Sequence, residues 1–342
     1  MPLPGAFARF RGAIEETLRS ALAGHHPDTL YRMLRYHLGW EDERGRPLAA
    51  GGGKLLRPTL CLLACQAAGG DWQRALPAAA AVELVHNFSL VHDDIQDRDR
   101  ERRHRPTVWS VWGEAQGINA GDALLALARL SLSRLVEAGV AAATVVEAGR
   151  VLDAATLEMV EGQVLDLECE ERRKVGLDVY LGMIEKKTGV LFDCSLRLGG
   201  LLGSEHRGVI EGLGRCGRLL GVTFQVRDDM LGVWGAESET GKAAAADIRR
   251  RKKSLPVVYA LERAQGATAE ALERAYAKPE LDEGDVSIVL EALDALGAQA
   301  YCREVARGRK EGALAALDGL QLEPSATEEI RQVADFMLER DF

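Results

Sequence analysis

Hydrophobic residues along most of this 342-residue chain recur every three or four positions, which is the period of an α-helix. Between Ala78 and Ile95 they form a single apolar stripe, made of Leu84, Phe88, Val91 and Ile95. Strand-type alternation is nearly absent, and only ten prolines interrupt the chain. The pattern predicts an all-α protein.

The same periodicity predicts further helices, over Ala123–Val136, Val151–Cys169, Leu177–Leu202, Gly208–Leu231, Leu255–Ala264 and Ala326–Phe342. Clusters of glycine, proline and charge predict the breaks between helices, at Arg44–Gly53, Arg98–Pro106, Gly232–Arg250 and Lys278–Gly284. No low-complexity linker or repeat of fixed period divides the chain, so we expect residues 1–342 to form one helical domain.

Composition narrows the class of protein. A hydrophobic content of 47% with 28% charged residues is typical of a globular protein and argues against disorder. No window approaches ~18 uninterrupted apolar residues, and the N-terminal stretch lacks the apolar core of a signal peptide. The six cysteines are scattered, with Cys61 and Cys65 one turn apart in an apolar run, which indicates core residues. We therefore expect a protein of the reducing cytoplasm.

The net charge of −9 gives the chain no general affinity for nucleic acid. An anionic substrate would need local basic clusters or bridging metal ions.

The segment Phe88–Pro106 contains both a cluster of basic residues and carboxylates that could bind metal ions. On a helix, the carboxylates of Asp93, Asp94 and Asp97 fall within roughly 100° of arc, where they repel one another. Mg²⁺ relieves such repulsion, because it takes carboxylate oxygens and completes its shell with water and phosphate oxygens. Alone, the motif is also compatible with a solvated acidic helix end. Its polar face, opposite the apolar stripe, would carry His86, Ser89, Asp93 and Asp97.

A second acidic pair, Asp228 and Asp229, ends another apolar helical run, with Gln225 one turn earlier. Carboxylates on facing helices of a bundle commonly build an internal metal site. Two such clusters are much stronger evidence for a metal site than one.

The basic residues have ordinary interpretations when taken singly. The arginines between Arg98 and Arg105 are compatible with a solvated loop, and the run Arg249–Lys253 with an exposed helix end. His86 is compatible with a buried structural histidine, and Gln163 and Asp166 with a surface pair.

Taken in order, the motifs resemble those of the trans-isoprenyl diphosphate synthases of the polyprenyl synthetase family. They are GGKLLRP at 52–58, the first acidic motif with its trailing RRHRPT, Lys187-Thr188, FQVRDD at 224–229, and GK…D…KKSLP at 241–256. The resemblance covers most of the chain. It implies a class I isoprenoid synthase fold, a helical bundle around a central cavity, and usually a homodimer.

The resemblance also implies a reaction and its residues. Family members ionise an allylic diphosphate with the help of Mg²⁺, and isopentenyl diphosphate attacks the resulting carbocation. The metal ligands would be Asp93, Asp97 and Asp228, with Asp94, Arg102, Lys187 and Asp229 as further catalytic residues. Isopentenyl diphosphate would meet Lys54, Arg57, His86 and Arg103. The allylic diphosphate would meet Arg102, Lys187, Thr188, Gln225, Lys242 and Lys252.

Two positions depart from the family pattern. Gly232 stands where the second motif usually has its last aspartate, and Leu55 replaces a frequent arginine. We expect Gly232 to weaken metal organisation without abolishing it, and Gly232→Asp to be tolerated or to raise metal affinity.

Two other functions fit the same fold. A terpene cyclase would not need the four groups of the isopentenyl diphosphate pocket, which are all present, and a silent regulatory subunit would lose first-motif aspartates, which are intact. Chain elongation is therefore favoured. Phe88 lies five residues before Asp93, and this arrangement resembles that of short-chain synthases. Helical geometry, however, turns Phe88 away from Asp93 and places the small Ser89 beside Asp93. We expect a C20 product, with C15 next.

Overall fold

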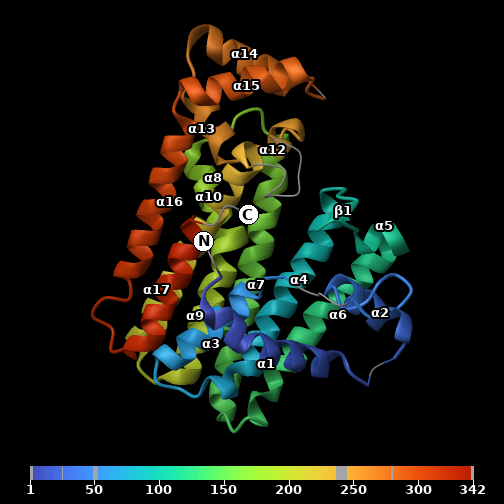
Figure 1. Cartoon of the computed structure of the whole chain (residues 1–342), viewed down its shortest axis with the longest axis vertical. Helices are drawn as coiled ribbons and strands as arrows, with labels where there is room; N and C mark the ends of the chain where they lie inside the picture. The colour runs from blue at the N-terminus through green and yellow to red at the C-terminus, as the bar shows by residue number, and fades with distance from the viewer. Residues whose placement is uncertain (1–2, 25, 49–52, 236–244, 279, 340–342) are drawn as a thin grey trace.

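A computed structural model describes residues 3–24, 26–48, 53–235, 245–278 and 280–339. The described chain is almost entirely helical, which confirms the all-α prediction (Figure 1). Its elements are α1 (Gly5–Leu22), α2 (Asp28–His37), α3 (Leu56–Ala67), η1 (Trp72–Ala75), α4 (Leu76–Gln96), β1 (Glu101–Arg102), β2 (Arg105–Pro106), α5 (Val108–Trp112), α6 (Glu114–Ser133), η2 (Arg134–Val136), α7 (Ala142–Glu171), α8 (Leu177–Ile184), η3 (Glu185–Gly189), α9 (Val190–Gly203), α10 (Arg207–Trp234), α12 (Ala246–Arg249), α13 (Leu255–Arg263), α14 (Gly266–Ala277), α15 (Glu283–Ala295), α16 (Ala298–Ala315) and α17 (Pro324–Glu339).

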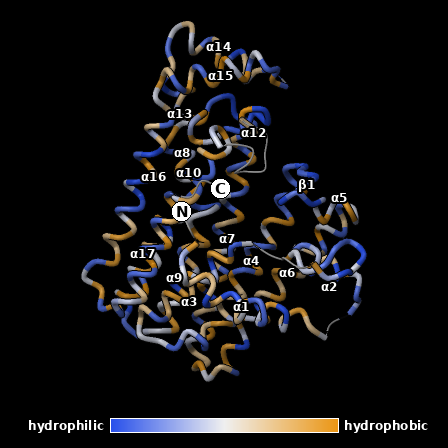
Figure 2. The backbone as a smooth tube through the Cα atoms, in the orientation of Figure 1, coloured by the Kyte–Doolittle hydropathy of each residue, from blue (hydrophilic) through white to orange (hydrophobic). Residues whose placement is uncertain are grey.

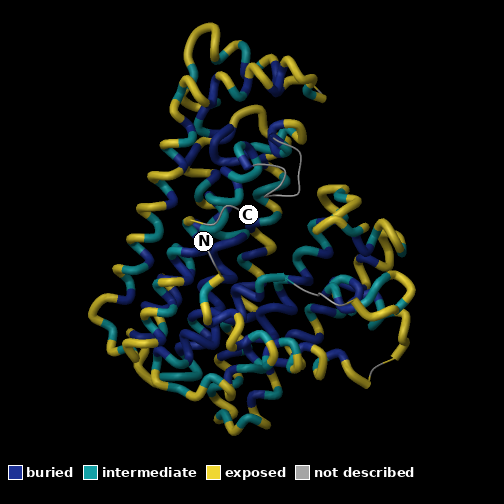
Figure 3. The backbone as a smooth tube through the Cα atoms, in the orientation of Figure 1, coloured by how far each residue is buried: buried dark blue, intermediate teal, exposed yellow. Residues whose placement is uncertain are grey.

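The main bundle forms where α3, α4, α9 and α10 pack together. Nearly every residue of α3 is buried, including Cys61 and Cys65, because this helix is covered by neighbours on all sides. The first half of α4 is buried on all sides, whereas α10 carries both buried apolar and more exposed polar positions along its length (Figure 2). Figure 3 shows the buried backbone concentrated in this bundle, while much of the α14–α15 hairpin at one end is exposed.

The helix α4 shows how the sequence determines an element. Pro77 lies in its first turn, where a missing N–H costs nothing, and the run Ala78–Ala81 is fully buried, which permits close packing against α6. The helix ends at Gln96, and Asp97 is its C-cap. The first acidic motif therefore lies in the last turn of a helix whose body is fixed in the core.

Several boundaries differ from the prediction. The stretch Leu177–Leu202 is helical throughout, as predicted, but the π-helical segment η3 interrupts the α-helical hydrogen bonding between α8 and α9. The break at Arg98–Pro106 contains a two-stranded antiparallel hairpin, β1–β2. Gly232 is not in a break but in the last turns of α10, and α17 ends at Glu339 within the described residues. Outside the predicted ranges lie the helices α1, α2, α3, α5, α12 and α14–α16.

No helix among the described ranges is both long and apolar enough to cross a lipid bilayer.

Candidate active site

A cavity of about 360 Å³ lies between α4, α7, α10 and the segment η3–α9. Its wall includes Asp93 from the first acidic motif and Asp228 from the second, so the two motifs meet across one cavity, as expected. Other predicted site residues also line it, namely Arg57, His86, Arg102, Arg103, Lys187, Thr188 and Gln225.

Apolar side chains make up another part of the wall. They are Phe88, Leu90, Met159, Val160, Leu191 and Phe224. Phe88 was expected to point away from the site, but it lines the cavity together with Ser89, and its ring packs edge-on against His92 at 4.9 Å between centroids. The cavity is wide enough for both neighbours on α4 to reach it.

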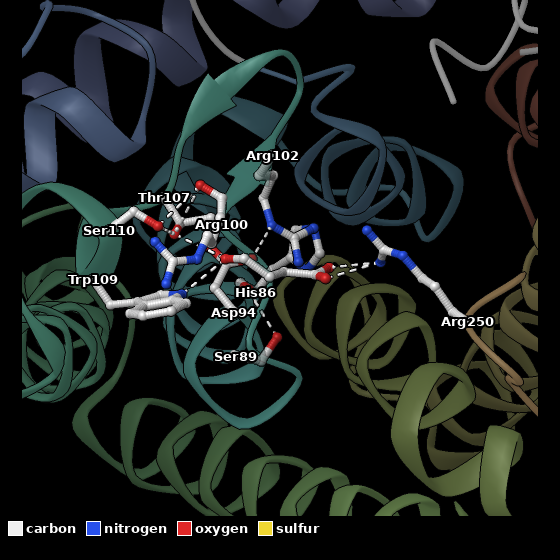
Figure 4. Close-up of polar contacts among 10 residues, drawn as sticks. His86, Ser89, Asp94, Arg100, Arg102, Thr107, Trp109, Ser110 and Arg250 are labelled. Carbon is white, nitrogen blue, oxygen red and sulfur yellow. Dashed lines mark hydrogen bonds and ion pairs between the residues drawn. The ribbon is translucent and has the colours of Figure 1, made fainter. Parts of the chain in front are cut away.

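The aspartates of the first motif have different surroundings. Asp93 lines the cavity, whereas Asp94 is 1% exposed and accepts a 2.7 Å hydrogen bond from Arg102 Nε (Figure 4). Burial raises the pKa of Asp94 to about 6, although Arg102 opposes the shift. Asp94 therefore does not line the cavity; it holds Arg102, which does. Asp97 is exposed at the helix end and is not part of the described wall.

The hairpin carries two arginines into the site on a strained turn. Arg103 and His104 form its two central residues with φ of 53° and 59°, a conformation in which glycine and asparagine are preferred. Arg103 lies close to Gly53: a Cβ at Gly53 would be 2.9 Å from Arg103 Nη2. Because Gly53 has no side chain, the guanidinium of Arg103 can lie against the backbone of the glycine-rich segment.

Arg57 is fixed among aromatic rings. It is buried, and its guanidinium lies 4.4 Å from the centre of the Phe192 ring and 5.9 Å from that of Phe224. The carboxyl of Glu83 is also buried; burial raises its pKa, and the positive charges of Arg57 and Arg103 oppose the shift. Glu83 is a counter-charge that the sequence reasoning missed, because nothing in the pattern distinguishes it from a surface glutamate.

His86 lines the cavity as a neutral imidazole. Burial, together with Arg57, Arg103 and Arg102, holds its pKa well below the usual value. The side chain is half-buried on the cavity wall, so His86 is a cavity residue and not a fully buried structural histidine.

A lysine from η3 lies between acidic groups of α4 and α7. Lys187 Nζ donates a 2.5 Å hydrogen bond to Asp166 Oδ2, on α7. One turn earlier on α7, Gln163 Nε2 donates a 2.8 Å hydrogen bond to Gln96 Oε1, on α4. Burial opposes the charge of Lys187, but Asp93 and Asp166 outweigh it and raise its pKa. Gln163 and Asp166 are therefore not a mere surface pair.

Asp229 is a structural carboxylate. It is 1% exposed and accepts hydrogen bonds from Tyr180 Oη at 2.5 Å, Gln225 Nε2 at 3.0 Å and the Leu255 amide at 3.1 Å. Burial raises its pKa to about 6, against the effect of these donors and of Lys252. Gln225 in turn accepts a 2.8 Å bond from Thr188 Oγ1, so Asp229 orients cavity residues without lining the cavity.

The remaining predicted lysines lie off the described wall. The ammonium of Lys54 lies 5.5 Å from the ring centre of Phe336, on α17. Lys252 lies among carboxylates; burial opposes its charge, but Asp247 and Asp229 lead the groups that raise its pKa. Lys242 falls outside the described residues.

An ion pair joins the loop after the first acidic motif to the end of α12. Arg250 Nη1 lies 2.8 Å from Asp99 Oδ1, in the loop that follows the first motif, and Figure 4 shows Arg250 reaching toward that loop from α12. Both groups are partly exposed, so we expect the pair to add little stability.

Gly232 is not an open position. A Cβ there would lie 2.1 Å from Asp247 Oδ2, so Gly232→Asp requires the Asp247 side chain to move, and its tolerance stays a prediction.

The donor set suits a hard divalent cation that also binds phosphate. Within the described ranges, no three His, Cys, Asp or Glu side chains are grouped so that they could hold a metal by themselves. Mg²⁺ needs no such cage, because it is commonly bound by one or two carboxylates plus substrate phosphates and water. Asp93 fits this use: burial raises its pKa, and Asp97 and Asp166 add to the shift, so a cation would relieve unfavourable negative charge.

Comparison with known proteins identifies the family. The polyprenyl synthetase family model matches residues 42–293. The chain is 39% identical to the (2E,6E)-farnesyl diphosphate synthase of Mycobacterium tuberculosis, over 90% of this chain and 85% of the relative. It is 40% identical to the geranylgeranyl diphosphate synthase of the same organism, over 85% of this chain and 82% of the relative.

Solved structures agree. The polyprenyl synthetase of Streptomyces coelicolor superposes with a TM-score of 0.90 at 37% identity, covering 97% of this chain and 98% of its own. A geranylgeranyl pyrophosphate synthase of Corynebacterium glutamicum, complexed with isoprenyl diphosphate and magnesium, gives a TM-score of 0.83 at 26% identity, covering 99% and 100%. The chain belongs to the polyprenyl synthetase family and is a short-chain trans-prenyl diphosphate synthase of the farnesyl and geranylgeranyl type.

Proposed function

We propose that this synthase condenses isopentenyl diphosphate with an allylic diphosphate in a Mg²⁺-dependent reaction whose main product is C20, with C15 next. The observation that carries the proposal is the shared cavity: Asp93 and Asp228 lie on its wall with arginine and lysine side chains and an apolar lining.

Two groups of cavity residues would bind the two diphosphates. Arg57, His86 and Arg103 suit isopentenyl diphosphate, because the two guanidiniums are held in place and the imidazole is neutral and ready to donate a hydrogen bond. Arg102, Lys187, Thr188 and Gln225 suit the allylic diphosphate. Lys54, Lys242 and Lys252 stay predicted substrate contacts.

The metal would be held by Asp93, Asp97 and Asp228. Bound there with the allylic diphosphate, Mg²⁺ would supply electrophilic assistance to the departing diphosphate. The chain's own cations act in the same direction: Lys187 and Arg102 stabilise negative charge as the allylic C–O bond breaks and diphosphate leaves. Because Asp166 and Asp94 hold these two cations, little reorganisation is needed.

The rest of the reaction needs a dry space. The double bond of isopentenyl diphosphate attacks the allylic carbon and a C–C bond forms; a proton then passes to the released diphosphate, which restores a double bond. The apolar wall around Met159, Leu191 and Phe224 excludes water that would otherwise quench the cation.

Product length is the finer part of the proposal. The edge-on ring pair Phe88–His92 places bulk on the wall of α4, which supports a short product. Ser89 on the same wall leaves some room, which favours C20 over C15.

A homodimer is part of the proposal. Val146, Leu157 and Val164 recur at helical spacing on α7 and are all more than half exposed. A second copy of the chain is the partner that we expect on this stripe. The cytoplasmic location stays a prediction from the sequence.

The test is product analysis. Purified protein would be incubated with Mg²⁺ and isopentenyl diphosphate plus dimethylallyl, geranyl or farnesyl diphosphate, and the products identified by mass spectrometry. We expect longer prenyl diphosphates that stop mainly at C20. A hydrocarbon or terpene alcohol formed from one diphosphate alone would instead indicate cyclisation, and no turnover with any primer would contradict the proposal.

A further inference from the structure

Four elements meet around the side chain of Arg218, on α10. Its Nη1 and Nη2 donate hydrogen bonds of 2.7 and 3.1 Å to the two carboxylate oxygens of Glu158, on α7. Its Nε donates a 3.0 Å bond to Asp193, on α9, and its Nη1 lies 3.7 Å from the carboxylate of Glu185, the first residue of η3. The five N–H donors of a guanidinium make such a set of contacts possible. Arg218 therefore connects α10 to α7, α9 and η3.

This network is partly shielded from water and lies outside the candidate active site. Asp193 is 5% exposed, and the side chains of Arg218 and Glu158 are 25% and 31% exposed. The three residues are not on the wall of the cavity that contains Asp93; they line a second cavity of about 320 Å³ between α7, α9 and α10. Salt and water screen such ion pairs less than surface pairs. Any effect of the network on the reaction must therefore pass through another element.

The backbone of η3 packs tightly against α10 at the same place. A Cβ built on Gly189, the last residue of η3, would lie 3.1 Å from the carbonyl oxygen of Arg218. A Cβ built on Gly221, one turn further along α10, would lie 2.6 Å from the Cα of Gly189. The lack of a side chain at Gly189 and Gly221 allows the two backbones to approach this closely. Both ends of η3 therefore lie beside α10 near Arg218.

Between its two ends, η3 carries two residues of the cavity wall, Lys187 and Thr188. Thr188 Oγ1 donates its 2.8 Å hydrogen bond to Gln225, which lies seven residues after Arg218 on the same face of α10. A π-helical turn is rare, and its i→i+5 hydrogen bonds add one residue to the turn. The directions of Lys187 and Thr188 therefore depend on this turn being kept.

We propose that Arg218 is a positioning residue that holds the π-helical turn η3, and through it Lys187 and Thr188, in the place where the allylic diphosphate would bind. The contacts to Glu158 and Glu185 connect α7 to the start of η3, and the contact to Asp193 fixes the helix that follows η3. This inference rests on the proposed function for the identity of the anion.

Hydrogen exchange tests the positioning role directly. Arg218→Met removes the guanidinium and keeps an unbranched apolar side chain. The amides of residues 185–189 should then exchange at least about fivefold faster than in the wild type, because the turn opens more often. Mass spectrometry of the exchanged peptides gives this rate.

Arg197→Met is the matched control. Arg197 also donates a hydrogen bond to Asp193, at 2.8 Å, and its side chain is 29% exposed, but this ion pair lies within α9. Exchange at residues 185–189 should therefore stay within about twofold of the wild type in Arg197→Met. Equal exchange in the Arg218→Met and Arg197→Met proteins would overturn the inference.

Kinetics test the consequence for the site. We expect Arg218→Met to raise KM for the allylic primer at least about fivefold and to leave KM for isopentenyl diphosphate within about twofold, because Lys187 and Thr188 belong to the allylic group. A lower melting temperature with both KM values unchanged would mean that Arg218 only stabilises the fold, and would overturn the inference.

Glu158→Gln tests the same contact from α7. It keeps the volume of the side chain and removes its charge, so it should raise the same KM by a smaller factor. The double variant with Arg218→Met should be no worse than Arg218→Met alone, because both changes break one contact. Fully additive effects would contradict the role of this ion pair. If Arg218→Met does not fold, Glu158→Gln decides.

The exchange measurement also separates this inference from the proposed function. It requires neither primer nor turnover, so it compares the variants even if the wild type is inactive with every primer. Such inactivity would refute the function, whereas exchange at residues 185–189 that does not respond to Arg218→Met would refute the role of Arg218.

Discussion

Phe88 and Ser89 are consecutive residues of α4, and both lie on the cavity wall. Phe88 is also in ring contact with His92, one turn later. If the cavity holds a growing prenyl chain as proposed, we expect the larger side chain to limit its length and the smaller one to leave room.

Removing that bulk should lengthen the product. We expect Phe88→Ala to shift the main product by at least one C5 unit, because the cavity gains the volume of the ring. Stability should fall by about 3 kcal/mol, the lower end of the range for a buried phenylalanine, because one side of the ring faces the cavity. Ser89→Ala, a change of one atom on the same wall, is the control. Product analysis by mass spectrometry checks both, and an unchanged product distribution in Phe88→Ala would show that other residues limit the chain.

Residue identities were easier to predict than residue roles. Helical spacing suggested that Asp93 and Asp228 end apolar helices, and the resemblance to the family singled them out as metal ligands; the structure places both on the cavity wall. The separation of Asp93 from Asp94 does not follow, because it depends on Arg102 returning from the hairpin to bind Asp94. Nor does the sequence show that Asp247 fills the space at Gly232.

At the scale of elements, α4 and α10 could be predicted because their apolar periodicity is long and regular. The π-helical segment η3 could not be predicted, although it carries Lys187 and Thr188 into the site. Its geometry depends on contact with α7: a Cβ at Gly162 would lie 2.3 Å from the Lys187 amide nitrogen. Close approach of two backbones leaves no periodic signal in either segment.

This contact gives a prediction for α7. Gly162→Ala should destabilise the protein by about 1–3 kcal/mol, because backbone atoms must move to admit the methyl group, and it should raise KM for the allylic primer by displacing Lys187. Gly149→Ala, on the same helix with nothing within 4 Å, should instead stabilise by up to about 1 kcal/mol. Denaturant unfolding and steady-state kinetics check the pair. Equal effects of the two substitutions would be inconsistent with the tight α7–η3 contact.

The whole molecule presents the exposed α7 stripe of Val146, Leu157 and Val164 to solvent. Three large apolar residues on one helical face favour association of two copies.

We expect the wild-type protein to sediment at twice its chain mass of 37.1 kDa. Leu157, which is 63% exposed, is the most exposed of the three, and Leu157→Asp should yield monomers because a charge on each copy would be buried against the partner. Ile288→Asp, at an exposed apolar position on α15, should leave the mass unchanged. Analytical ultracentrifugation distinguishes these outcomes, and a dimeric Leu157→Asp protein would place the interface elsewhere.

The central claim is that carboxylates from α4 and α10 act on the same bound ions. The single substitution Asp93→Ala should reduce turnover by orders of magnitude with the helical circular dichroism unchanged, but one variant cannot show that the two motifs act together.

A double-mutant cycle can. Calorimetric titration of inorganic pyrophosphate in the presence of Mg²⁺ would be performed on wild type, Asp93→Asn, Asp228→Asn and the double variant. We predict that the losses in binding free energy are coupled by at least about 1 kcal/mol, because each carboxylate is of little use to the shared ions without the other. Strictly additive losses would contradict the claim that the two acidic motifs form one site.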